Sequence, residues 1–171
     1  MRSTVQFMPT ELDGPYLTAA ALCERTIQES DGVLTLVRLV DKVTASPVSL
    51  PGATAGATEA PGFRPFMVSL SLVVALKAGS ASDTRTVRVV PREPSGEQLP
   101  ATEAEVSFAG DNPARGVNVV INTNLGVREV GLYWFDVFLN EQMLSRIPLQ
   151  IEYQPAGGQQ PPLRLAPESG E

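Results

Sequence analysis

The residues best suited to binding chemistry in this chain share one face of the segment GLYWFDVFLNEQMLSRIPLQIEY. In an extended strand every second residue points to the same side, so Trp134, Asp136 and Phe138 lie together. After a chain reversal, Leu144 and Arg146 return to that side. A carboxylate beside a guanidinium can form an ion pair, and aromatic residues with arginine are typical of protein–protein contacts. These five residues define a candidate protein-interaction patch.

The two strands of this segment are expected to pair so that their apolar faces both meet the core. In an antiparallel pair the numbers of facing residues sum to a constant. A three-residue loop at 140–142 places Leu139 opposite Met143. The outward pairs are then Phe138–Leu144, Asp136–Arg146 and Trp134–Pro148, an exposed ion pair between two apolar pairs. Such cross-strand pairs contribute roughly 0.2–1 kcal/mol each.

Two interpretations of this outward face remain open. In the first, Trp134 and Phe138 only cover their own hairpin, or lie beneath the C-terminal tail or another strand. In the second, these rings, with Leu144 and Arg146 beside them, bind another protein. Pro148 has no backbone N–H, which indicates that the last strand is an edge strand or carries a bulge. An edge strand can also accept a strand from a partner.

Several classes of chemistry have no support in the sequence. The chain contains no histidine and one cysteine, Cys23, in the apolar stretch AAALCERTI. We expect Cys23 to be a small buried residue, because a catalytic thiol needs an activating base. No phosphate-binding glycine motif or EF-hand spacing occurs. Asp31, Asp83 and Asp111 are possible calcium donors, but no spacing demonstrates a site. We therefore expect no catalytic residue, cofactor or metal ion.

Charge and composition limit the expected partners and location. The net charge is −6, and no lysine- or arginine-rich run occurs, so nucleic-acid and anionic-membrane binding have little electrostatic support. The most apolar run, from Phe66, is interrupted by Ser69 and Ser71 and is not a membrane span. A single cysteine and the lack of a signal-peptide pattern favour a cytoplasmic location. The preference for arginine over lysine suggests a GC-rich, bacterial genome.

The alternation of apolar and polar residues predicts an all-β chain. One buried face per strand indicates antiparallel sheets packed as a β-sandwich. We expect a flexible lead-in at 1–15, one domain at 16–153 with a flexible loop at 45–65, and a disordered tail at 154–171. About eight strands are predicted, at 16–27, 33–45, 66–78, 83–90, 104–110, 116–125, 131–139 and 143–153.

The order of these features resembles an uncharacterised family of small bacterial β-sandwich proteins, defined only as a domain of unknown function. The matching marks are the early apolar segment around Cys23, the Asp31-Gly32 turn, and a Gly-Leu-Tyr strand at Gly131 followed by a Pro-Leu strand at Pro148. The resemblance covers about residues 16–153. It implies an immunoglobulin-like or C2-like sandwich, and it implies no catalytic residue.

Tyr133 follows Gly131 as in the penultimate strand of immunoglobulin-like domains, where a tyrosine hydroxyl bonds back to the backbone. Together these features predict a non-enzymatic adaptor or assembly module that binds a protein partner or a second copy of itself. The alternative is a small-ligand or calcium-binding sandwich that uses the loops at the strand ends. A third possibility, an enzyme with a carboxylate-based site, would need a groove that the sequence does not indicate.

Overall fold

The computed structural model describes residues 14–31, 33–46, 63–108, 112 and 114–154. The segments expected to be flexible, at 1–15, 45–65 and 154–171, lie mostly outside these residues, and so does Asp111.

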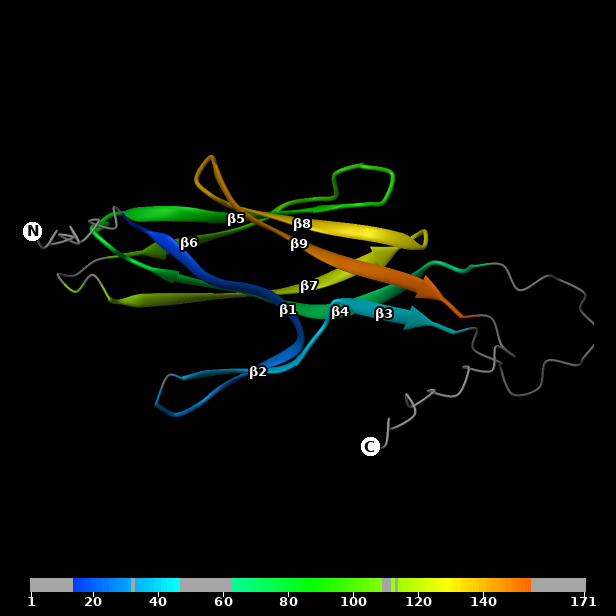
Figure 1. Ribbon diagram of the computed structural model, residues 1–171, viewed down its shortest axis with the longest axis horizontal. Coiled ribbons are helices and arrows are strands. Elements are labelled where there is room, and N and C mark those ends of the chain that lie inside the picture. The colour runs from blue at the N-terminus through cyan, green and yellow to red at the C-terminus, as the bar shows by residue number, and fades with distance from the viewer. Residues whose placement is uncertain (1–13, 32, 47–62, 109–111, 113, 155–171) are drawn as a thin grey trace, which may run out of the picture.

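The described residues form nine β-strands in two sheets and no helix (Figure 1). The all-β prediction is therefore confirmed. The four-stranded sheet contains, in spatial order, β2 (Leu34–Leu39), β1 (Tyr16–Gln28), β4 (Phe66–Lys77) and β7 (Gly116–Val127). The five-stranded sheet contains, in spatial order, β3 (Lys42–Ala45), β9 (Gln142–Tyr153), β8 (Gly131–Leu139), β5 (Thr84–Arg92) and β6 (Thr102–Ser107).

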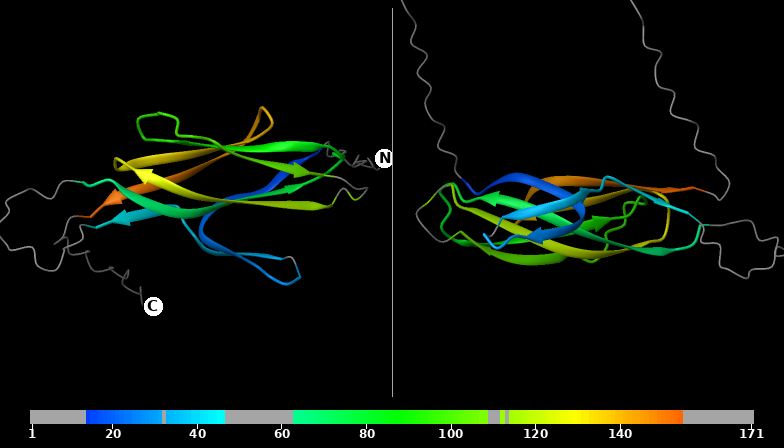
Figure 2. Two further views of the ribbon diagram at one scale, coloured as in Figure 1. Left: turned by 180° about the vertical axis from the view of Figure 1, so that it is seen from behind. Right: turned by 90° about the horizontal axis from the view of Figure 1, so that it is seen from below.

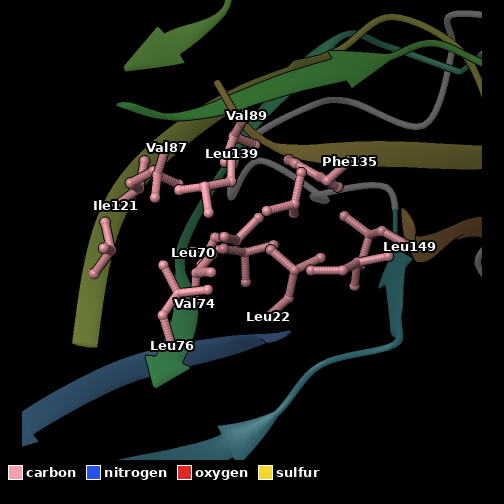
Figure 3. Packing of buried hydrophobic residues seen from close by; sticks show 14 of the residues in the cluster. Leu22, Leu70, Val74, Leu76, Val87, Val89, Ile121, Phe135, Leu139 and Leu149 are labelled. Atoms are coloured by element: carbon pink, nitrogen blue, oxygen red, sulfur yellow. The ribbon is translucent and has the colours of Figure 1, made fainter. Parts of the chain in front are cut away.

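The core lies between the two sheets, which face each other as two layers (Figure 2). Leu22 and Val74 of the four-stranded sheet point toward Phe135 and Leu149 of the five-stranded sheet (Figure 3). This arrangement follows from the period of two in each strand, which places every second side chain on the inner face. Burial of each large apolar side chain stabilises the fold by about 1.5–3 kcal/mol.

The segment 33–45, predicted as one strand, forms two strands that belong to different sheets. β2 pairs antiparallel with β1, whereas β3 pairs in parallel with the end of β9. Arg38, within β2, has a φ of 55°, in the left-handed region, and the chain passes from β2 to β3 through the two residues Val40 and Asp41. The structure therefore has nine strands where about eight were predicted, and the prediction of wholly antiparallel pairing is wrong for β3 and β9.

The distal part of β1 diverges from its neighbour β4. β1 pairs with β4 only from Tyr16 to Cys23, and beyond Cys23 it pairs only with β2. The resulting β1–β2 hairpin projects from the four-stranded layer (Figure 1). It exposes Ile27, Val33 and Leu39, which the strand pattern alone did not mark as exposed.

Tyr133 links the start of β8 to the preceding turn. Its side chain is fully buried, and its hydroxyl donates to the carbonyl oxygen of Glu129 at 3.0 Å. Burial raises the pKa of Tyr133, and hydrogen bonds with the backbone of Glu129 and Arg128 partly oppose that rise. The predicted return bond from the tyrosine to the backbone is confirmed.

Replacement of Tyr133 by phenylalanine is expected to lower the free energy of unfolding by about 0.5–1.5 kcal/mol, because it removes one buried hydrogen bond and retains the ring. Urea denaturation followed by circular dichroism measures the change. Tyr153→Phe is the matched control, since the Tyr153 ring packs edge-on against Phe63. Equal losses in the two variants would mean that the Tyr133 hydroxyl contributes nothing specific.

Candidate functional site

The predicted patch lies on the outer face of the five-stranded sheet, centred on β8, the middle strand. Trp134, Asp136 and Phe138 all point outward from β8. Facing residues come from β5 on one side and β9 on the other. The facing pairs are Arg92 and Pro148 beside Trp134, Val90 and Arg146 beside Asp136, and Arg88 and Met143 beside Phe138.

Asp136 is the buried centre of this face, with 1% of its side chain exposed. Arg146 binds it in a bidentate manner, with Nε on Oδ1 and Nη2 on Oδ2, the latter at 3.1 Å. Arg92 adds a third bond from Nε to Oδ2 at 2.6 Å. The sequence predicted an exposed ion pair of Asp136 with Arg146 alone. Arg146 is indeed a partner of Asp136, but the Asp136 carboxylate is buried and not exposed, because long side chains from both neighbouring strands cover it.

The electrostatics of Asp136 follow from this geometry. Burial by itself raises the pKa of Asp136, but hydrogen bonds from Arg146 and Arg92 and the positive charges of both outweigh it. The pKa of Asp136 therefore lies below its ordinary value. The carboxylate in turn raises the pKa of Arg146. Asp136 is thus a permanently charged structural anion near neutral pH and is unsuited to proton transfer.

Arg92 is held from a second side by the loop between β5 and β6. Backbone bridging joins Arg92 to Gln98, and Leu99 N donates to the Pro91 carbonyl oxygen at 2.9 Å. With its amide oxygen turned toward Arg92, Gln98 accepts from Nη1 and Nη2 at 3.1 and 3.0 Å. The guanidinium of Arg92 therefore makes its hydrogen bonds within the domain, to Asp136 and Gln98.

Both aromatic rings of the patch lie next to an arginine. The Arg88 guanidinium carbon is 4.5 Å from the ring centroid of Phe138, and that of Arg146 is 5.8 Å from the ring centroid of Trp134. Both distances are within the range of cation–π attraction. The two rings are half-buried. The outer face therefore presents aromatic surface whose orientation is supported by charged neighbours.

The end of the β8–β9 hairpin differs from the prediction. Pairing follows the predicted register from Tyr133–Leu149 to Val137–Ser145, then shifts so that Phe138 faces Met143. The turn has two residues, with Asn140 at a φ of 52°, a conformation that asparagine tolerates. The predicted three-residue loop at 140–142 is therefore wrong.

This shift removes Leu144 from the patch. Leu144 is half-buried and packs against the core cluster. Met143, 44% exposed, stands opposite Phe138 in its place. A bulge adds one residue to one strand and moves the following side chain to the other face, which explains the exchange. The structure thus brings together Trp134, Asp136, Phe138 and Arg146, and it excludes Leu144.

Pro148 was predicted to mark an edge strand or a bulge. β3 pairs with β9 only at Gln150–Tyr153, so the part of β9 before Gln150 has β8 as its one partner strand among the described residues. Pro148 lies in this part, where a missing N–H removes no ladder bond to a second strand. The edge prediction holds for the first part of β9 and fails for its end.

The other residues considered for chemistry lie apart from this face. Cys23 is fully buried as predicted, and its thiol contacts the Ser71 carbonyl oxygen at 3.4 Å. Burial raises the pKa of Cys23, which disfavours the thiolate, despite a smaller opposing backbone hydrogen bond. Asp83 pairs with Arg85 at 3.1 Å, and Asp31 accepts the backbone N–H of Val33 at 3.0 Å. Within the described part of the chain, no group of three histidine, cysteine or acidic side chains could hold a metal ion.

Sequence reasoning missed Arg88 and Arg92, which complete the patch from β5. The alternation of TRTVRVVPR placed both arginines on the outward face of that strand, but β5 lies about 40 to 50 residues before β8 in the chain. Only the pairing of Arg92 with Trp134 and of Arg88 with Phe138 brings these arginines to the site.

These features define an all-β domain of two packed sheets whose outer face carries two aromatic rings, each beside an arginine. The chain belongs to a family of unknown function, DUF6941, whose model matches residues 18–152. The expected membership of an uncharacterised family is thereby confirmed. No curated protein matches the sequence. The described residues contain no helix of the length and apolarity that a membrane crossing requires.

Proposed function

We propose that this protein is a non-enzymatic interaction module that binds a protein partner, or a second copy of itself, through the outer face of the five-stranded sheet. The observation that carries the proposal is the group of Trp134 and Phe138 around the buried Asp136, with Arg146 and Arg88 beside the two rings. Clusters of aromatic residues with arginine are typical of interface hot spots.

Preorganisation favours this face as a binding surface. Asp136 holds Arg92 and Arg146 in place, and Arg146 in turn lies beside Trp134. Side chains that are already ordered lose less conformational entropy when a partner docks. Met143 and Leu132, both partly exposed, extend the apolar area along the same sheet.

Exposed apolar residues also occur on the β1–β2 hairpin and on the outer side of the four-stranded sheet, at Ile27, Val33, Leu39, Met67 and Val120. These residues are all aliphatic. Hot spots are enriched in tryptophan, tyrosine and arginine, whereas leucine and valine are under-represented. The outer face of the five-stranded sheet is therefore the stronger candidate.

We also propose that the sandwich is immunoglobulin-like and not C2-like, in a cytoplasmic protein of bacterial origin. The run β9-β8-β5-β6 supports the fold assignment, because it follows the order of the corresponding sheet in variable-type immunoglobulin domains. The bond from Tyr133 to the Glu129 carbonyl at the start of the penultimate strand supports it as well. The location and origin rest on the single cysteine and the excess of arginine over lysine.

The double variant Trp134→Ala/Phe138→Ser is expected to abolish the partner or homodimer contact, because loss of interface anchors commonly costs about 2 kcal/mol or more of association. Its melting temperature should stay close to that of the wild type, since both rings are only half-buried. Light scattering measures self-association, and capture from the native cytosol measures partner binding. Circular dichroism gives the melting temperature.

The matched control is Met67→Ser/Val120→Ser, which removes exposed apolar side chains from the other sheet. This control should keep the contact. If the wild type is monomeric and captures nothing that the double variant loses, the proposal fails. Loss of the contact in the control but not in the Trp134/Phe138 variant would move the interface to the four-stranded sheet.

A further inference from the structure

We infer that β7 is a further binding site, at which an uncharged, extended segment of a partner protein adds a strand to the four-stranded sheet. The inference goes beyond the proposed function, because β7 belongs to the other sheet. It rests on two features that meet at the first half of β7, which are an unpaired strand edge and a groove beside that edge.

β7 differs from the other edge strands of the described residues, which are β2, β3 and β6. β3 has four residues, and β2 and β6 have six each, with a left-handed φ at Arg38 in β2 and exposed Glu103 and Glu105 on β6. Short length, charges and an irregular backbone all discourage a further strand from pairing. β7 has twelve residues, GVNVVINTNLGV, without a charged residue, a proline or a shift in its register with β4. It therefore has none of these protections.

The register of β7 shows which of its backbone groups are directed to the open edge. In an antiparallel pair, facing residues alternate between those that exchange hydrogen bonds and those that do not. Ala78 N–H donates to the Arg115 carbonyl oxygen at 2.9 Å, and this pair continues the β4–β7 register by one residue. Every second residue from Arg115 is therefore bonded to β4, and the residues between them direct their N–H and C=O groups away from it. These residues are Gly116, Asn118, Val120, Asn122, Asn124 and Gly126.

A groove of about 240 Å³ lies beside this edge, between β7 and the β1–β2 hairpin. The hairpin, which lies across the outer side of the four-stranded sheet (Figure 2), contributes Gln28 and Leu34 to the lining. β7 contributes Gly116, Asn118 and Val120, whose backbone groups are directed to the open edge. The groove and the edge thus form one site. The volume is below the roughly 300–1,000 Å³ of typical small-molecule pockets and suits one large side chain.

The chemistry of this site selects an uncharged segment in extended conformation. Backbone groups along a strand edge bind the backbone of an added strand, and pockets for alternate side chains provide specificity. Leu34 and Val120 give the groove apolar surface, and the side-chain amides of Gln28 and Asn118 can bond a neutral polar group. A tyrosine fits this combination, since it has an apolar ring and a hydroxyl. A charged side chain would find no counter-ion among the lining residues.

A second copy of this chain is the less favourable occupant. β6 lies against β7 at this side of the sandwich and exposes Glu103 and Glu105. Two copies joined along β7 would bring the glutamates of both β6 strands to one junction, on chains that each carry a net charge of −6. Like charges at such a junction oppose association. The inferred occupant is therefore a segment of a different protein.

The experiment titrates the full chain with the blocked peptide acetyl-Thr-Val-Tyr-Val-Thr-Val-Thr-amide in two N-methylated forms, followed by calorimetry. With the tyrosine side chain in the groove, the N–H groups of the tyrosine and of the two threonines after it face β7, and those of the valines face away. The form methylated on its three valines should bind. The form methylated on the tyrosine and the two threonines after it should bind at least about tenfold more weakly, because the bonds to β7 are lost.

Amide hydrogen exchange measured by NMR locates the peptide on the chain. In the free protein, the N–H groups of Asn118, Val120 and Asn122 should exchange faster than those of Val119 and Ile121, which are directed to β4. The valine-methylated peptide should slow exchange at the first three residues about tenfold at saturation. Slower exchange elsewhere but not in β7 would place the peptide at another site and overturn the inference.

Val120→Pro removes one N–H at the open edge and no bond to β4, so it should keep the sheet and weaken the peptide about tenfold. Glu105→Pro is the matched control and should bind normally. By the same alternation, counted from the bond between Phe108 N–H and the Asp83 carbonyl oxygen, Glu105 directs its N–H to the open edge of β6. Leu34→Glu leaves β7 unchanged and should weaken the peptide about tenfold, because it places a charge in the groove.

Equal binding of the two methylated peptides, or no binding of the valine-methylated form up to about 1 mM, would overturn the inference. Unchanged binding by Leu34→Glu would overturn it even if Val120→Pro did not fold. Self-association of the pure protein that Val120→Pro abolishes would assign the edge to a second copy and would also overturn it. Trp134→Ala/Phe138→Ser should bind the peptide like the wild type, and loss of binding there would move the peptide to the other sheet.

Discussion

Phe135→Ala is expected to lower the free energy of unfolding by about 3–5 kcal/mol. Phe135 is 1% exposed and lies in the central strand of the five-stranded sheet, where it packs in the core. Its removal forfeits the transfer free energy of the ring and leaves a cavity that the surrounding side chains fill only in part. Urea denaturation followed by far-ultraviolet circular dichroism measures the loss.

Trp134→Ala is the natural comparison, because Trp134 is the next residue along β8 and points to the opposite face. It should cost clearly less, since the ring is half-buried and outside the core cluster. If Trp134→Ala cost more than Phe135→Ala, the face described as outer would be the core, and the account of the patch would be wrong.

The second large effect concerns the buried carboxylate. The double variant Arg92→Met/Arg146→Met keeps long apolar side chains over Asp136 and removes both of its cations. Loss of the partners of a buried charge is strongly destabilising, because its desolvation is no longer compensated. We expect the melting temperature at pH 7 to fall by about 6–10 °C, measured by circular dichroism.

The pH dependence of this effect has a definite sign. In the wild type the pKa of Asp136 is lowered, so its contribution to stability is complete above the unfolded pKa of about 3.9 and is lost as the pH falls through the folded value. In the double variant, burial without cations raises the pKa of Asp136 above the unfolded value. The difference in melting temperature should therefore be largest near pH 7 and shrink below about pH 4.

Asp136→Leu in the double-variant background is the control. It replaces the stranded carboxylate with an apolar side chain of similar size, and it should recover much of the lost stability. A melting temperature that stays low in this triple variant would show that the two arginines stabilise the sheet mainly by packing. A loss that is equal at all pH values would contradict the role assigned to the Asp136 charge.

Much of the fold could be predicted because alternation reports directly on which face of a strand is buried. The inward set of β8, from Tyr133 to Leu139, and the pairing of Asp136 with Arg146 both followed from that alternation and from the need to bury one face. Such patterns are strong where one face of a sheet is buried, since a slip of one residue would expose the whole apolar set.

The parts that failed depend on local backbone geometry or on distant pairing. The two-residue turn at Asn140 and the shift after Val137 decide whether Leu144 or Met143 faces outward, and alternation contains no signal for a bulge. The break between β2 and β3 at residues 40–41 likewise depends on the parallel pairing of β3 with the end of β9, which lies more than 100 residues further along the chain. The burial of Asp136 depends on Arg92, which only the β5–β8 pairing brings to it.

The most direct measurement for the central claim is site-specific photo-crosslinking from the proposed face. A benzophenone amino acid at Met143 reports on the outer face of the five-stranded sheet without altering its aromatic residues, and one at Met67 reports on the other sheet. With the native cytosol or at high concentration of the pure protein, we predict one defined crosslinked product from position 143 and none from position 67. The product should disappear in the Trp134→Ala/Phe138→Ser background. Crosslinking from position 67 alone, or equally from both positions, would contradict the assignment of this face as the binding surface.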